Sequence, residues 1–173
     1  YVAYQDAANN NKATVMKYNG TAWVVVGTAG FSTGQAYYIS LALDSAGMPY
    51  LSYKDSNNNY KATVMSYNGS AWVTVGAAGF SAGTAGFTSL KFNSAGTPYL
   101  AYQDAANSNK ATVMKYNGTA WVVVGIAGFS AGDADDISLV LDSTDTPYVT
   151  YADGVKNDAA TVMKYNGSAW VVV

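Results

Sequence analysis

The sequence predicts an all-β fold, a β-propeller segment built of near-identical four-stranded antiparallel blades. Tryptophan recurs every 49 residues, at Trp23, Trp72, Trp121 and Trp170, and the residues around each are nearly the same. No insertion interrupts this period, and each unit is rich in valine, threonine and aromatic residues. A repeat of this length with strand-like content is typical of propeller blades, each of which is one small sheet stacked against its neighbours.

The unit from residue 50 to residue 98 contains four predicted strands. Residues 50–55 (YLSYKD) and residues 61–67 (KATVMSY) form two of them, and an Asn-Gly hairpin turn leads to the third at residues 71–76 (AWVTVG). After a Gly-rich loop, residues 87–93 (FTSLKFN) form the fourth, and a Gly-then-Pro turn returns to the next unit. In blade order the strand at residues 87–93 is strand A, next to the propeller axis, and strands B, C and D follow outward.

Residues 1–173 therefore form a single repeat array. The array consists of strands B to D of a first blade followed by three full A-B-C-D blades. Because an open arc exposes two apolar blade faces, we expect the array to be part of a larger closed ring. The remaining blades would come from the same longer chain or from another copy.

Composition excludes most catalytic chemistry. The chain has no cysteine, histidine, arginine or glutamate, and its charges are nine lysines and eleven aspartates. Without histidine or cysteine there is no Ser-His or Cys-His pair and no imidazole or thiolate metal ligand. The absence of arginine and the slight negative charge argue against nucleic-acid binding, and no apolar run is long enough for membrane insertion. We therefore expect no enzyme and no cofactor, apart from a calcium ion considered below.

The loops between strands D and A and between strands B and C emerge at the same end of a propeller, and the repeats differ from one another mainly there. The start of strand A reads QAYY, TAGF and DADD in the three full blades. Recognition by loops on a rigid scaffold and free drift of exposed loops both account for this variation. The variable positions give the candidate ligand-binding residues Tyr37, Tyr38 and Phe87.

The D-to-A loop also carries an aromatic residue and a serine that do not change between repeats. A ligand site repeated in every blade would use such constant residues, but they equally suit anchors that hold the loop in place. The candidates are Phe31, Phe80, Phe129, Ser32, Ser81 and Ser130.

Aspartates gather at the loop end of the last blade. Several carboxylates together suit calcium, which takes six to eight oxygen ligands, and a carboxylate pair suits glycoside hydrolysis. Solvated surface acids are the plain alternative. The candidates are Asp133, Asp135, Asp136, Asp153 and Asp158.

A second set of aspartates recurs at the end of strand B in every unit. Four such carboxylates around the channel mouth would form a cation site. We expect instead that each one caps its own polar turn through hydrogen bonds to backbone amides. The set is Asp6, Asp55, Asp104 and Asp153.

Three motifs carry a resemblance to known proteins: SLALDSAGMPYLSYKD, KATVMKYNGTAW and VGTAGFSTG. The whole chain resembles repeat arrays in secreted or cell-surface β-propeller proteins of bacteria. The resemblance implies exposure outside the cytoplasm and a scaffold or ligand-binding role, and it supplies no site residues.

These observations lead to one main expectation about function and two alternatives. We expect a non-enzymatic extracellular scaffold or adhesive module that meets a protein or glycan partner with its D–A and B–C loop face. The first alternative is a lectin, because pockets lined by aromatic, amide and carboxylate side chains can stack on a sugar and bond to its hydroxyls. The second is a hydrolase that uses the aspartate cluster of the last blade.

Overall fold

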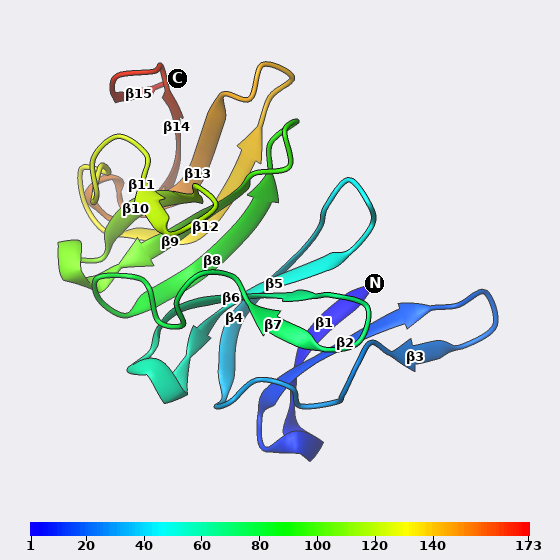
Figure 1. The fold of residues 1–173 in the computed structure, drawn as a ribbon. Helices are drawn as coiled ribbons and strands as arrows, with labels where there is room; N and C mark the ends of the chain where they lie inside the picture. The colour runs from blue at the N-terminus through cyan, green and yellow to red at the C-terminus, as the bar shows by residue number, and fades with distance from the viewer.

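The computed structural model describes residues 1–173 as fifteen strands in four antiparallel sheets (Figure 1). The first sheet, blade 1, has three strands in the order β1-β2-β3. These strands span Val2–Asp6, Lys12–Tyr18 and Trp23–Val25. In the repeat they correspond to strands B, C and D.

The other three sheets each have four strands, whose order in the sheet is their order in the chain. Blade 2 contains β4 (Ala36–Leu43), β5 (Pro49–Asp55), β6 (Lys61–Tyr67) and β7 (Trp72–Thr74). Blade 3 contains β8 (Ala85–Phe92), β9 (Pro98–Asp104), β10 (Lys110–Tyr116) and β11 (Trp121–Val123). Blade 4 contains β12 (Ala134–Leu141), β13 (Pro147–Asp153), β14 (Ala159–Tyr165) and β15 (Trp170–Val172).

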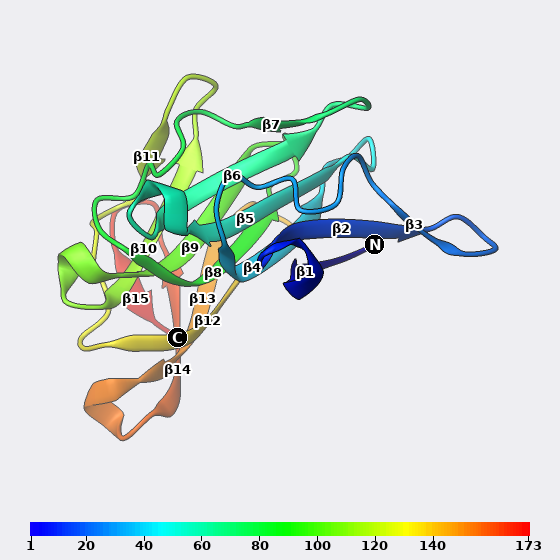
Figure 2. The same cartoon turned by 90° about the horizontal axis from the view of Figure 1, so that it is seen from below.

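The sheets follow one another in chain order along an arc, from the blue N-terminal sheet to the orange and red C-terminal sheet (Figures 1 and 2). The strands A of blades 2, 3 and 4 contact one another, β4 against β8 and β8 against β12. They therefore form the inner side of the arc. This is the β-propeller arrangement that the repeat predicts.

The core is divided into three clusters, each between two neighbouring sheets. Between blades 1 and 2, for example, Val15 of β2 packs with Leu51 and Tyr53 of β5, and all three side chains are fully buried. Burial of one such side chain stabilises a fold by about 1.5–3 kcal/mol. Because each cluster joins two sheets, a blade gains its stability from stacking on its neighbours, as in other repeat proteins.

Two strand predictions needed correction. Strand A begins earlier than predicted, at Ala85 in blade 3 rather than at residue 87, and its pairing with strand B shifts register between Gly86 and Ser89. The same β-bulge occurs in blades 2 and 4, and an irregularity of this kind has no signature in an apolar alternation pattern. Strand D is shorter than predicted, ending at Thr74 in blade 2, because Gly76 turns the chain with a φ of 76°.

A single 3₁₀ turn joins strands B and C in every blade. These turns are η1 (Ala7–Asn9), η2 (Ser56–Asn58), η3 (Ala105–Asn107) and η4 (Gly154–Lys156). None of them has the length and apolar character that crossing a bilayer requires.

Candidate functional site

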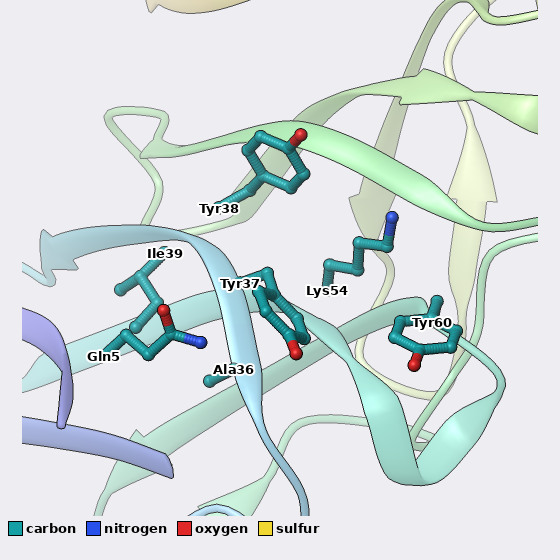
Figure 3. A pocket seen from close by; sticks show the side chains of 7 residues that line it. All are labelled: Gln5, Ala36, Tyr37, Tyr38, Ile39, Lys54 and Tyr60. Carbon is teal, nitrogen blue, oxygen red and sulfur yellow. The ribbon is translucent and has the colours of Figure 1, made fainter. Parts of the chain in front are cut away.

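A pocket of about 360 Å³ surrounds the start of β4, as shown in Figure 3. The β-bulge turns this segment, so that Tyr38 has a left-handed φ of 48°. Tyr37 lies at the centre of the lining, with Gln5 and Ile39 on one side and Lys54 and Tyr60 on the other (Figure 3). The full lining is Gln5, Ala36, Tyr37, Tyr38, Ile39, Lys54 and Tyr60.

Tyr37 and Tyr60 are two of the three tyrosines that line the pocket, and their rings have centroids 6.3 Å apart and planes inclined by 40°. The hydroxyl of Tyr37 donates a hydrogen bond to Oε1 of Gln35, which orients the ring. Tyr60 keeps 45% of its surface exposed. Two half-open rings at this spacing can contact a flat apolar face of a ligand.

Tyr60 also occupies a strained backbone position. Its φ is 60°, a conformation that bulky residues rarely adopt. The equivalent positions of the other blades have the same conformation but carry Asn11, Asn109 and Asp158, residue types that tolerate it well. Blade 2 alone therefore places an aromatic side chain at this position, at a conformational cost.

Lys54 is the one charged residue in the pocket lining. Its ammonium lies 5.6 Å from the ring centroid of Tyr38 and 5.3 Å from that of Tyr60 (Figure 3). These are cation–π distances, and they hold the half-buried lysine in place without neutralising it. The only ion pair in the molecule joins Lys156 to Asp153, in blade 4.

The corresponding positions between the other blades have different chemistry. Between blades 3 and 4, Nε2 of Gln103 donates a hydrogen bond to Oδ1 of Asp135. Gln103 and Asp135 stand where blades 2 and 3 carry Lys54 and Gly86. The blades therefore have the same strands but different residues at these surface positions. The pocket around Tyr37, called the aromatic pocket below, is confined to blade 2 and the adjoining edge of blade 1.

The constant residues of the D-to-A loop make contacts within the fold. Phe31 stacks on Trp72 of the next blade, with centroids 4.2 Å apart and planes 4° from parallel, and lines a shallow hollow with it. Ser32 is 1% exposed; its hydroxyl accepts a bond from the amide of Ala13 and donates one to the carbonyl of Gly34. The same contacts recur at Phe80, Phe129, Ser81 and Ser130. The serine hydroxyls are therefore used for hydrogen bonds within the fold.

Phe87 lies near the axis rather than in the aromatic pocket. Its ring is 4.8 Å from that of Tyr38, and both line a hollow of about 330 Å³ together with Asp136. These three residues are equivalent in the repeat and share a φ of 47–49°. Of the candidate residues at the start of strand A, the structure thus brings Tyr37 and Tyr38 into one pocket and sends Phe87 to another.

The five aspartates of the last blade do not assemble. Nowhere in the molecule do three or more carboxylates lie close enough together to hold a metal ion. Asp153 is buried and caps η4, and Asp135 accepts the bond from Gln103. Asp133, Asp136 and Asp158 are exposed at separate points. Sequence proximity at one end of a blade suggested the cluster, but the strand pleat and the bulge direct the side chains apart.

The recurring aspartates of strand B are caps, as predicted. Asp6 accepts bonds from the amide of Ala8, from Nδ2 of Asn9 and from the hydroxyl of Thr14, at 3.1, 2.9 and 2.7 Å. These bonds, the one from Thr14 above all, lower the pKa of the Asp6 carboxyl below its ordinary value. The same cap forms at Asp55, Asp104 and Asp153, so these oxygens are not free for a cation at the channel mouth.

Five pocket residues were not among the sequence candidates: Gln5, Ala36, Ile39, Lys54 and Tyr60. A position-by-position comparison of the repeats would have found Tyr60, because it replaces asparagine or aspartate at a turn. Gln5 and Lys54 vary as well, but only the fold shows that they face the same space from different blades.

Comparison with known proteins supports the architecture. A fucose lectin from Kordia zhangzhouensis is 16% identical, with a TM-score of 0.52 over 78% of this chain and 96% of the lectin. A fucose-specific lectin from Aleuria aurantia is 19% identical, with a TM-score of 0.65 over 95% of this chain and 54% of the lectin. An exo-β-1,3-galactanase from Clostridium thermocellum is 9% identical, with a TM-score of 0.58 over all of this chain and 44% of the enzyme.

The chain thus spans about half the length of the Aleuria lectin. No protein-family model matches the sequence, and no curated protein matches it. The kinship with secreted bacterial repeat propellers therefore stays a prediction from the motifs. What the chain shares with the solved lectins is its fold, a β-propeller of four-stranded antiparallel blades.

Proposed function

We propose that this chain is a carbohydrate-binding module and that a saccharide binds in the pocket around Tyr37. The observation that carries the proposal is the pairing of Tyr37 with Tyr60 across a pocket that also presents the amide of Gln5 and the ammonium of Lys54. Sugar recognition uses this combination of aromatic faces and polar groups. The volume of about 360 Å³ is in the range of small-molecule sites.

Two further observations support the proposal. Tyr60 takes a strained conformation that its asparagine and aspartate equivalents take easily, and such strain is concentrated at functional sites. The Kordia and Aleuria propellers of similar fold are fucose lectins, which favours a lectin over the general scaffold or adhesive function.

The pocket lining suits binding rather than hydrolysis. Glycoside hydrolysis uses two carboxyl groups on either side of the scissile bond, and the seven lining residues include no aspartate or glutamate. The similarity to the galactanase therefore supports the shared fold, while the function proposed here is non-enzymatic.

A glycan array of neutral and acidic saccharides tests the proposal. The parent chain should bind at least one saccharide, and Tyr37→Ala should weaken that binding about tenfold or more through loss of a stacking face. Tyr18→Ala is the control, because Tyr18 is an exposed tyrosine that lies outside the pocket. Absence of binding to every saccharide, or equal loss in both variants, would refute the proposed site.

A further inference from the structure

We infer that the saccharide is acidic and that its anionic group pairs with Lys54; the inference rests on the function proposed above. Lys54 is half-buried, lies over two tyrosine rings and is the only charge in the pocket lining. A cation held in this way lacks the anionic partner that would complete a charge-assisted hydrogen bond.

The repeat itself shows where a partner is missing. In blades 3 and 4 the side chain of Gln103 is met across the gap by the carboxylate of Asp135. In blades 2 and 3 the equivalent pair is Lys54 and Gly86, so the position that supplies a carboxylate in one gap has no side chain in the other. Strand β5, which carries Lys54, lies against β8, which carries Gly86.

The nearest carboxylate in the sequence cannot serve Lys54 either. Asp55 is fully buried and points to the opposite face of β5. Its two oxygens already accept bonds from the amide of Asn57, from Nδ2 of Asn58 and from the hydroxyl of Thr63. The ammonium is thus left to an anion from outside the chain.

Lys54 is also positioned to bond to a substituent of a sugar ring that stacks on Tyr37 and Tyr60. Tyr60 is close to both Tyr37 and Lys54: its ring centroid is 6.3 Å from that of Tyr37 and 5.3 Å from the ammonium of Lys54. A pyranose against Tyr37 and Tyr60 would bring a carboxylate or sulfate within reach of Lys54. The ligand class is therefore a saccharide bearing such a group, for example one containing uronic acid.

Two substitutions that the repeat already accommodates test the inference. Lys54→Gln places in blade 2 the residue that blades 1 and 3 carry, as Gln5 and Gln103. Gly86→Asp places in blade 3 the residue that blade 4 carries, as Asp135, and supplies an internal carboxylate. Gly86 does not have a positive φ, and an added Cβ would lie 2.9 Å from Oε1 at the far end of the Gln103 side chain.

The measurement is calorimetric titration with three matched oligosaccharides: one neutral, one with uronic acid and one with sulfate. The parent chain should prefer an acidic probe, and the preference should decrease as salt is raised. Each variant should lose about tenfold more affinity for that probe than for the neutral one. Comparison of the carboxylate and sulfate probes identifies the group, and thermal melts confirm that both variants fold.

Equal affinity for neutral and acidic probes that Lys54→Gln leaves unchanged would overturn this inference, while the proposed lectin function would stand. Failure of all three probes to bind would overturn both. The two failures are therefore distinguishable in one experiment.

Discussion

The indole of Trp72 in blade 2 donates a hydrogen bond from Nε1 to the carbonyl oxygen of Val26 at the end of blade 1, at a distance of 2.9 Å. The same bond joins Trp121 to Val75 and Trp170 to Val124, also at 2.9 Å. A tryptophan buries a large apolar surface and needs a partner for its N–H. The repeated tryptophan therefore joins each blade to the preceding one at the outer side of the arc, and this hydrogen bond is called the latch below.

Loss of one latch should weaken the stack. Trp121→Phe keeps an aromatic ring but leaves the carbonyl of Val75 without its donor, so the free energy of unfolding should fall by about 1–3 kcal/mol. Trp23→Phe is the control, since Trp23 is 51% exposed. Urea unfolding measures both, and an equal effect at the two positions would contradict the role assigned to the latch.

A glycine directly follows each valine whose carbonyl accepts this bond, and because it has no side chain it leaves room for the tryptophan. A Cβ added to Gly76 would lie 3.0 Å from Cε2 of Tyr116 and 3.2 Å from Cδ1 of Trp121. Gly69 also has a positive φ, of 98°, but nothing lies within 4 Å of its added Cβ.

Both alanine substitutions should therefore carry backbone strain, and only Gly76→Ala should also disturb packing. We expect Gly76→Ala to destabilise the chain by about 1–3 kcal/mol more than Gly69→Ala. Thermal or urea unfolding of the two variants gives this difference directly. If they prove equally stable, the glycine is required for its conformation alone.

The repeat predicted the architecture because blades are stabilised by contacts that recur with it. Val113 and Tyr102 are buried in blade 3, as their repeat equivalents Val64 and Tyr53 are in blade 2. The site was harder to predict, because it depends on departures from the repeat. Lys54 and Tyr60 are single deviations at two positions, and only the β-bulge and the blade stacking bring them beside Tyr37. The aspartates show the converse, since their position at one end of blade 4 did not bring three carboxylates together.

The aspartate cap should be a main stabilising element of each B–C loop. Asp104 is 1% exposed and accepts bonds from the amide of Ala106, Nδ2 of Asn107 and the hydroxyl of Thr112. Thr112 in turn accepts a bond from the amide of Gly128 in the next loop. Asp104→Ala should lower the free energy of unfolding by about 2–3 kcal/mol.

Asp133→Ala serves as the control for the cap, because Asp133 is exposed. It should change stability by less than about 0.5 kcal/mol. Equal effects of Asp104→Ala and Asp133→Ala in urea unfolding would show that the cap contributes nothing specific.

Stability should fall at alkaline pH because of buried tyrosines. Burial, together with the carboxylate of Asp153, raises the pKa of the Tyr151 hydroxyl from 10.0 to about 12. Between these values the unfolded chain releases the proton and the folded chain keeps it. The stability that is present below pH 10 is therefore lost as the pH rises toward 12.

Denaturant unfolding from pH 9 to pH 12 measures this dependence. Tyr151→Phe should have a shallower decline in that window, since one of the linked protons is removed. A decline in the variant as steep as in the parent would show that Tyr151 titrates at its ordinary pKa in the fold.

Replacement of Tyr60 should raise the stability of the fold and remove saccharide binding. Tyr60→Asn installs the residue that Asn11 and Asn109 provide at the same φ, near 60°. The variant should be about 1 kcal/mol more stable than the parent, because asparagine relieves the strain, and it should lose saccharide binding with the ring. Thermal melts and glycan binding are measured on the same sample. A less stable variant with unchanged binding would contradict the functional reason given for the strained tyrosine.

The most direct measurement of the central claim is a crystal structure of the chain with the preferred acidic saccharide. We predict one sugar ring against Tyr37 and Tyr60 with its anionic group on Lys54. A saccharide bound instead at the gap between Gln103 and Asp135, or on the stacked Phe and Trp rings of the D–A loops, would contradict the account.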